Sequence, residues 1–219
     1  SSGGIRQILG SLTVVNSTIS GNTATGTTTG GGIESSGTAL TLINSTVSGN
    51  SVTGSSASNG GGISTDVATT TIRNCTITNN SGAGGISGVR TGGGIVTVSN
   101  SIIAGNVSNI TQPDIGGTFT SGGGNLIGNA GTANGFTNGV NSDQVGNGAS
   151  PINPQLAALA NNGGRTQTHA LLAASPALNA GLIAQIPADT FDIDGDTNVA
   201  EPLPFDQRGT GFTRAIGTV

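Results

Sequence analysis

Four seven-residue phrases, each beginning and ending with Asn, recur along the first half of the chain. They read NSTISGN at 16–22, NSTVSGN at 44–50, NCTITNN at 74–80 and NSIIAGN at 100–106, so that successive phrases start 26 to 30 residues apart. A period in this range is typical of proteins built from stacked repeats. These units show no apolar pattern with a helical period, which argues against a helical solenoid.

Aligning the repeats produces three apolar columns separated by Gly, Ser, Asn or Thr turns. The first column is formed by the last residue of each SGGI or GGGI phrase: Ile5, Ile33, Ile63 and Ile95. The second column is Val14, Leu42, Ile72 and Val98, and the third is Ile19, Val47, Ile77 and Ile103. Their β-branched side chains favour strands. Three strands per coil, each stacked on the same strand of the next coil, describe a parallel β-helix. We predict an all-β, right-handed parallel β-helix with about 26–32 residues per coil, the hand following from the crossover rule.

Two rows of Asn side chains come with the repeated phrase. The first row is Asn16, Asn44, Asn74 and Asn100, and the second is Asn22, Asn50, Asn80 and Asn106. Asn tolerates the unusual backbone angles of a corner and can hydrogen-bond along a stack. We therefore interpret both rows as structural ladders at the corners of the coil.

The regular pattern weakens after Asn106, and the residues beyond it read as irregular coils. We divide the chain into β-helix repeats over 1–150 and a C-terminal region over 151–219 that continues or caps the helix. Within that region, residues 156–160 are expected to form a short helical turn that ends at the Asn-Gly-Gly of 162–164. Residues 168–181 read as a strand followed by a turn.

The stretch DIDGDTN places oxygen-bearing side chains at alternating positions near the C-terminus. They are Asp192, Asp194, Asp196 and Asn198, with Glu201 close behind. Such a set suits Ca²⁺, which takes six to eight oxygen ligands. The Gly and Glu positions of an EF-hand are not matched, so we predict a single-loop calcium site that Glu201, Asp189 or Asp206 completes. The alternative is a solvated acidic turn in which Asp206 pairs with Arg208.

The C-terminal phrases also resemble a known family. The order DIGG, NLIG, NPQLAALANNGGRTQTHALLAASPALNAG, DIDGDTN and EPLPFDQRG is similar to bacterial surface proteins with right-handed parallel β-helix repeats and a choice-of-anchor Q domain. The Gly-Gly-Gly-Ile and Asn-Ser-Thr phrases resemble the repeats of polymorphic outer-membrane proteins. The resemblance implies an exported protein, either secreted or held on the bacterial cell surface.

Composition bears on several classes of function. The formal charge is −4, and six Arg with no Lys, Tyr or Trp give neither a basic stripe nor an aromatic platform for nucleic acid. No apolar run is long enough to span a bilayer. Glu34 and Asp66 are the only acids of the first 110 residues, so the shaft is poorly equipped as a polysaccharide lyase or hydrolase. Cys75, the single cysteine, replaces a Ser of the repeat and is expected to be buried.

These observations favour a non-catalytic structural protein outside the cell. The chain begins inside a repeat and stops before the closing strand expected from the family resemblance. We therefore expect either a piece of a longer surface protein or subunits that stack end to end as a filament. The alternative is an adhesin that binds surface glycans through the loops of variable length after each second Asn. An aligned row of Thr13, Thr41, Thr71 and Thr97 leaves ice binding as a weaker alternative.

Overall fold

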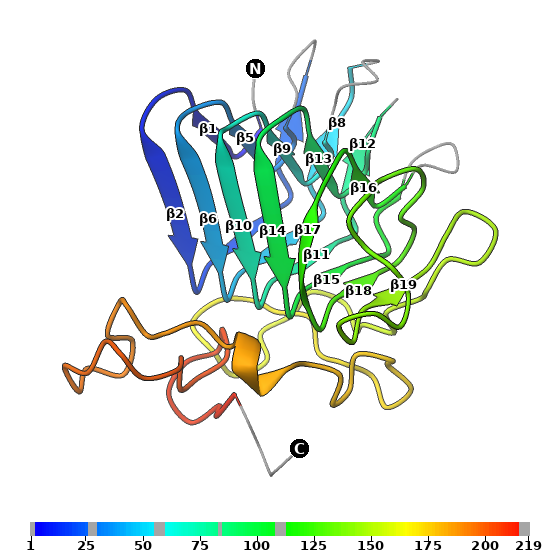
Figure 1. The fold of residues 1–219 in the computed structure, drawn as a ribbon. Helices are drawn as coiled ribbons and strands as arrows, with labels where there is room; N and C mark the ends of the chain where they lie inside the picture. Colours follow the sequence, from blue (N-terminus) through cyan, green and yellow to red (C-terminus); the bar gives the residue numbers. More distant parts are fainter. Residues whose placement is uncertain (1–2, 26–29, 55–59, 83–84, 108–112, 215–219) are drawn as a thin grey trace.

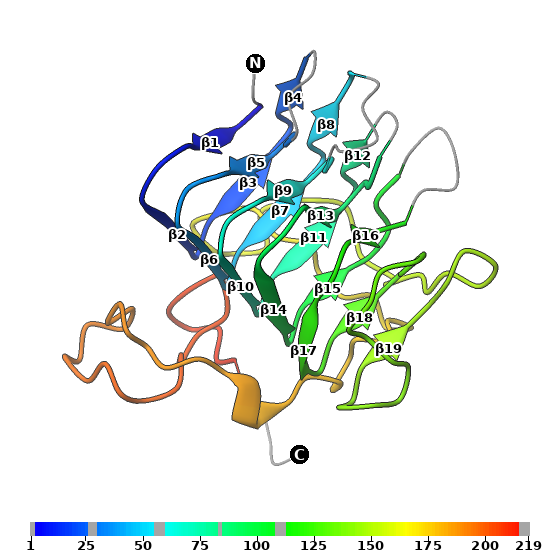
Figure 2. The same cartoon turned by 45° about the horizontal axis from the view of Figure 1, so that its top comes forward.

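The computed structural model describes residues 3–25, 30–54, 60–82, 85–107 and 113–214. The chain winds into a parallel β-helix, as the sequence predicts (Figures 1 and 2). Each early coil contributes four strands rather than the three expected, because a two-residue strand follows the second Asn of the phrase. Within the described ranges, no helix is long and apolar enough to cross a membrane.

Four parallel sheets run along the helix axis. Sheet 1 contains β1 (Ile5–Gln7), β5 (Ile33–Ser35), β9 (Ile63–Thr65), β13 (Val89–Thr91) and β16 (Ile115–Gly116). Sheet 2 contains β2 (Ser11–Val15), β6 (Ala39–Ile43), β10 (Thr69–Arg73), β14 (Ile95–Ser99) and β17 (Thr120–Gly123). Sheet 3 contains β3 (Thr18–Ser20), β7 (Thr46–Ser48), β11 (Thr76–Thr78), β15 (Ile102–Ile103), β18 (Leu126–Ile127) and β19 (Gln144–Val145). Sheet 4 contains β4 (Thr23–Ala24), β8 (Ser51–Val52) and β12 (Ser81–Gly82).

The second and third apolar columns stack in the predicted register. Val14, Leu42, Ile72 and Val98 are Cα partners in sheet 2, and Ile19, Val47, Ile77 and Ile103 are partners in sheet 3. These side chains are buried and form the core together with those of sheet 1. The alignment of like residues follows from the parallel register, which brings the same position of neighbouring coils to about 4.8 Å.

The first column is wrong at its fourth member. Val89, not Ile95, is the partner of Ile63, whereas Ile95 pairs with Thr69 in sheet 2 and its side chain is 62% exposed. The GGGI phrase at 92–95 thus forms the turn into β14. The position of Gly62 in the coil is instead taken by Gly88, whose carbonyl oxygen accepts hydrogen bonds from the amides of Gly62 and Ile63.

The second Asn row forms a continuous side-chain ladder. The ladder runs from Asn22 through Asn50 and Asn80 to Asn106. At each step the backbone amide and the Nδ2 of one Asn donate to the Oδ1 of the next Asn at 2.8–3.1 Å. The ladder ends at Asp114, whose Oδ1 accepts from the amide and Nδ2 of Asn106 and whose Oδ2 accepts from the amide of Asn129. A carboxylate accepts hydrogen bonds but does not donate them. The Asp114 side chain therefore accepts from Asn106 and donates to no further residue.

A second polar stack has the same ending. Ser101 donates its amide to Asn125 Oδ1, and Asn125 donates both its amide and its Nδ2 to Asp143 Oδ1 at 3.0 Å. Asp114 and Asp143 are 4% and 2% exposed, so both stacks end on a buried carboxylate. The same stack begins at Ser17, whose amide donates to Ser45 Oγ in the next coil. The coils become shorter along the stack, because its members are 28 residues apart at Ser17 and Ser45 but only 18 apart at Asn125 and Asp143.

The first Asn row is built differently. All four members have positive φ, between 46° and 53°, as expected for Asn at a corner. Two of the side chains, however, bond to the C-terminal region: Asn44 donates to the carbonyl of Phe205, and Asn100 exchanges two hydrogen bonds with the backbone of Leu182. Only Asn44 donates along the row, to Asn16. This row therefore attaches another segment rather than forming a ladder.

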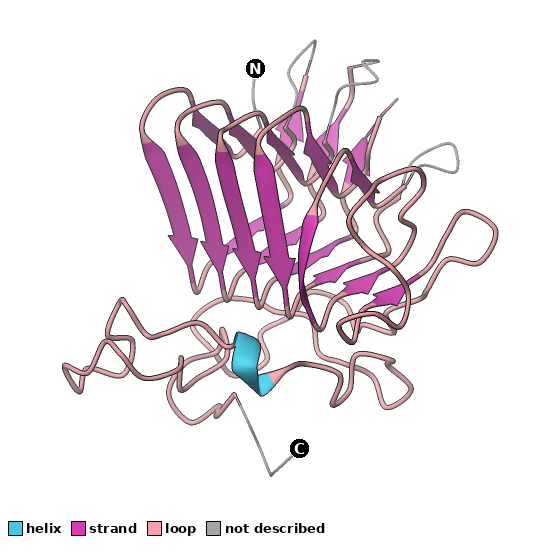
Figure 3. Cartoon of the chain, in the orientation of Figure 1, coloured by secondary structure: helices cyan, strands magenta, loops and turns pink. Residues whose placement is uncertain are grey.

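Residues 151–214 run mostly without regular structure beside sheet 3 (Figure 3). They contact its outer face through Thr18 to the carbonyl of Gln167, Thr46 to Gln207, and Ser48 to His169. The expected helical turn at 156–160 is wrong. This stretch is extended and pairs antiparallel with 168–172, because Ala160 exchanges backbone hydrogen bonds with Thr168. The described residues hold one short 3₁₀ turn, η1 (Ile183–Gln185).

Candidate calcium site

The acidic stretch forms a loop closed by a short antiparallel stem. Ala188 pairs with Pro202, and the amide of Asp189 donates to the carbonyl of Glu201 at 2.7 Å. The amide of Leu203 donates to the carbonyl of Pro187, and the Leu203 side chain is buried. The stem therefore brings two acids that are twelve positions apart in the sequence to the same end of the loop.

Inside the loop, the alternating acids curl the backbone. Asp192 has φ of 48°, and its Oδ1 accepts from the amide of Thr197 at 3.0 Å. Asp194 Oδ1 accepts from the amide of Asp196, and Asp196 Oδ1 accepts from the amide of Asn198 at 2.7 Å. Such local bonds are typical of Asp in turns. They bend the stretch so that its carboxylates gather instead of alternating along a strand.

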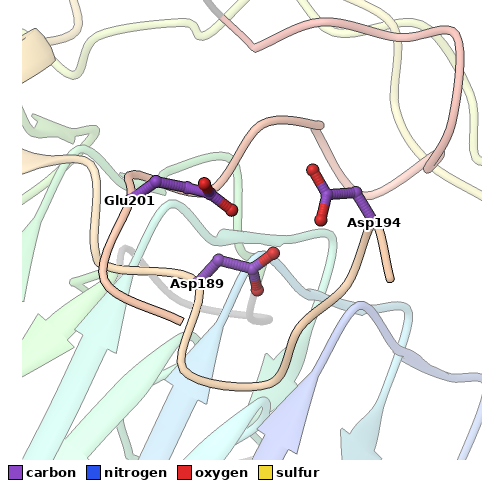
Figure 4. Close-up of side chains that lie close together, drawn as sticks. All are labelled: Asp189, Asp194 and Glu201. Atoms are coloured by element: carbon purple, nitrogen blue, oxygen red, sulfur yellow. The ribbon is translucent and has the colours of Figure 1, made fainter. Parts of the chain in front are cut away.

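Two groups of carboxylates result, and they share Asp194. One oxygen each from Asp192, Asp194 and Asp196 lie within 4.8 Å of one another, and so do oxygens of Asp189, Asp194 and Glu201. Figure 4 shows the second group, in which Asp189 and Glu201 come from the two sides of the stem and Asp194 from the tip. Four of the five residues predicted as ligands are thus divided between two groups that share Asp194, and Asp189 joins one of these groups.

Two oxygens of the second group have no hydrogen-bond partner. Asp189 is completely buried; its Oδ2 accepts from the amide of Ile193 at 2.8 Å, but its Oδ1 and Glu201 Oε1 are buried without a partner. Desolvation raises the pKa of Glu201, and the charges of Asp196, Asp194 and Asp189 raise it further. A buried carboxylate oxygen without a donor is costly, and a bound cation removes that cost.

The remaining candidates have other roles. Asn198 donates its Nδ2 to Glu201 Oε2 and accepts from the amide of Ala200, so its amide positions Glu201 in this structure. Asp206 is not part of either group, because it pairs with Arg208 at 2.6 Å as the alternative reading expected. The sequence indicates Asp189 only as a completing ligand, because its spacing does not reveal that the stem places it opposite Glu201.

The loops expected to bind glycans are described only in part, because residues 26–29, 55–59 and 83–84 lie outside the described residues. Cys75 is buried as predicted, and burial raises the pKa of its thiol to about 12. The predicted Thr row is in register in sheet 2, where Thr13, Thr41, Thr71 and Thr97 are Cα partners.

Comparisons with known proteins do not assign the chain to a family. No protein-family model, no curated protein and no solved structure matches it. The resemblance to β-helix surface proteins with a choice-of-anchor Q domain therefore stays a prediction, and the chain is placed by its fold alone, as a parallel β-helix.

Proposed function

We propose that this chain is a non-catalytic structural module of a secreted or cell-surface protein, and that Ca²⁺ bound by the 189–201 loop stabilises the C-terminal region. Two observations carry the proposal: the Oδ1 of Asp189 is buried without a donor, and one carboxylate oxygen of Asp189 lies within 4.8 Å of carboxylate oxygens of Asp194 and Glu201. Asp192 and Asp196 supply further oxygens around the shared Asp194.

The chemistry favours calcium over magnesium. Ca²⁺ accepts six to eight oxygens in flexible geometry, whereas Mg²⁺ requires a near-ideal octahedron and keeps several waters. A loop of exposed carboxylates with one buried member suits a weak to moderate calcium site. Calcium-binding modules outside cells work with dissociation constants of about 10⁻⁴ to 10⁻³ M, so a site of this strength would be occupied in an extracellular setting.

We also propose that copies of the chain assemble end to end into a filament. In all four sheets, each coil pairs in parallel with the next along one axis. A coil of a second molecule that continued this pairing would extend the sheets, and repeated head-to-tail contacts produce a filament. Negative-stain electron microscopy tests this part, because dispersed short rods at high protein concentration would exclude filaments.

Thermal unfolding with calcium and with EDTA tests the calcium site. Calcium at 100 times its dissociation constant adds about 2.7 kcal/mol to the free energy of unfolding, which corresponds to roughly 5–10 °C for a chain of this size. Asp189→Asn and Glu201→Gln should remove most of this shift. Asp66→Asn is the matched control, because Asp66 pairs with Arg90 on the shaft and is remote in sequence from the loop. Equal melting temperatures in calcium and EDTA would refute the site.

A further inference from the structure

A polar cavity lies between sheet 3 and the C-terminal region. Its volume is about 490 Å³, within the usual range for small-ligand sites. The β-helix side contributes Asn44, Thr46, Asn74, Thr76 and Ile102, and the C-terminal side contributes Thr168, His169, Arg208 and Arg214 among others. The lining combines hydrogen-bonding groups with the apolar side chains of Ile102, Ala170 and Leu171, so it suits a ligand that has both polar groups and an apolar face, as a sugar ring does.

The cavity lies where the C-terminal region leaves the first Asn row uncovered. Asn44 is covered by the carbonyl of Phe205 and by Arg214, and Asn100 by the backbone of Leu182. Asn74 lies between them in the row, lines the cavity, and has a buried Oδ1 without a partner. Asn100 shows what such a side chain binds, because its Oδ1 accepts from an amide at 2.8 Å while its Nδ2 donates to a carbonyl at 2.7 Å.

The opposite wall carries a positive charge that lacks a carboxylate partner. Arg208 is neutralised by Asp206, with its Nε and Nη2 both bonded to that carboxylate. Arg214 bonds instead to the neutral Oδ1 of Asn44, and its buried Nε has no partner. Among the described residues, none forms an ion pair with Arg214. Burial lowers the pKa of its guanidinium, and the charge of Asp206 opposes this effect.

Three further polar residues of the lining already have partners: His169, Gln207 and Asp206, the last bonded to Arg208. His169 bonds through Nδ1 to the carbonyl of Ala157 and through Nε2 to Ser48 Oγ. Gln207 donates to the carbonyl of Ser17 and to two Thr hydroxyl groups, and accepts from Thr46. Unmet hydrogen-bonding capacity is therefore found at Asn74, an acceptor, and at Arg214, a cationic donor.

We propose that this cavity binds a sugar acid, with the ligand carboxylate on Arg214 and a ligand hydroxyl group donating to Asn74. A guanidinium pairs best with a carboxylate, and a buried amide oxygen needs a donor such as a hydroxyl group. A single uronate residue carries both groups and fits a cavity of this volume. The inference goes beyond the proposed structural role, and it places glycan recognition at the C-terminal region rather than in the variable loops.

Isothermal titration with D-galacturonate, D-galactose and acetate tests the inference. Galacturonate should bind, and neither galactose, which lacks the carboxylate, nor acetate, which lacks the hydroxyl groups, should bind comparably. Arg214→Gln, which keeps a donor for Asn44, should weaken galacturonate binding about tenfold or more. Arg165→Gln is the matched control, because Arg165 is exposed and is not part of the cavity lining. The unliganded melting temperature of each variant shows whether it is folded.

Three results would overturn the sugar-acid site: no binding of galacturonate at roughly 10 mM, equal binding of galactose or acetate, or equal losses in the two Arg variants. Thr76→Val adds a milder variant of the cavity wall, which should reduce galacturonate affinity without unfolding the chain. Asp189→Asn separates this site from the calcium site. It should abolish the calcium shift while galacturonate still binds, so either proposal can fail alone.

Discussion

The side-chain amide of Asn50 donates to the side-chain oxygen of Asn80 at 2.9 Å, and both residues are fully buried. The same Asn80 oxygen accepts the backbone amide of Asn50 at 3.0 Å, and Asn80 Nδ2 continues to Asn106. One side chain therefore satisfies two donors of one coil and reaches the acceptor of the next. Hydrogen bonds in such chains polarise and strengthen one another.

Replacing Asn80 by Ala should be severely destabilising. The change leaves the amide and Nδ2 of Asn50 without their acceptor, and each buried unsatisfied group costs about 1–3 kcal/mol. We expect a loss of roughly 3 kcal/mol or more in urea unfolding. Asn79→Gly is the control, because Asn79 is exposed and has φ of 56°, which Gly tolerates. Comparable losses in the two variants would contradict a stabilising ladder.

Ile63 and Ile95 both follow a Gly triplet, yet Ala should affect them very differently. Ile63 is completely buried in sheet 1, so Ile63→Ala should cost about 2–5 kcal/mol. Ile95 is 62% exposed, so Ile95→Ala should cost about 0.5 kcal/mol or less. Urea midpoints measured side by side decide the point. A large loss from Ile95→Ala would mean that the sequence alignment of the Gly triplets, rather than the observed register, is correct.

Cys75 should react with thiol reagents only after unfolding. The side chain is 2% exposed, and burial raises its pKa to about 12, so the folded protein presents almost no thiolate at neutral pH. Labelling with Ellman's reagent should be slow in buffer and rapid in urea, with the same midpoint as the loss of far-ultraviolet circular dichroism. Cys75→Ser should change stability by about 1 kcal/mol or less, because Ser17, Ser45 and Ser101 occupy the same position in other coils. Fast labelling in buffer would contradict the buried position.

Calcium affinity should decrease on acidification, and the decrease should begin at a higher pH than it would for a Glu with an ordinary pKa. The pKa of Glu201 is raised, and its protonated form is a poor ligand, so protons compete with calcium above the usual value of 4.5. Below the raised pKa, affinity should drop about tenfold per pH unit for each proton displaced. The metal-free protein should respond in the opposite direction. Because the pKa of Glu201 is raised in the folded state, its protonation increases the free energy of unfolding as the pH falls through that pKa.

Titration calorimetry over a pH series measures the calcium dependence. Glu201→Gln should bind calcium more weakly and with a flatter pH profile, whereas Asp66→Asn should keep the profile of the parent chain. A parent chain whose affinity does not change as the pH approaches 4.5 would show that Glu201 is not a ligand.

The fold was predictable because the repeat exposes the register. Three aligned columns and two Asn rows determine which positions stack, and two of the columns occur as predicted. The register at Ile95 differs from the sequence alignment because identical Gly-Gly-Gly-Ile phrases occupy two different positions in the coil. Gly61 and Gly62 pack against the next coil, where an added Cβ would lie 2.4–2.9 Å from carbonyl oxygens of Ser87 and Gly88, whereas Gly94, with φ of 73°, makes a turn.

The candidate sites were predictable only in part, because they depend on contacts between distant segments. The alternating acids indicate the candidate calcium loop, but Asp189 joins them only through the pairing of Ala188 with Pro202. Asn74 and Arg214 are 140 positions apart, and nothing in their local sequence indicates that they line one cavity. The extended stretch at 156–160 also depends on a partner strand, so its local preference for a helical turn was misleading.

The Asn ladder has a direction, because every amide from Asn22 to Asn106 donates the same way and Asp114 accepts the last pair. An extra coil duplicated from this part of the shaft would receive one pair of donors and pass on one pair, leaving the hydrogen-bond balance unchanged. The same coil inserted between Asn106 and Asp114 would also be tolerated. In a coil stacked beyond Asp114, however, the Asn Oδ1 would lack donors, because the Asp114 carboxylate has no N–H group to donate. Lengthening by duplication is thus chemically neutral on one side of Asp114 and penalised on the other.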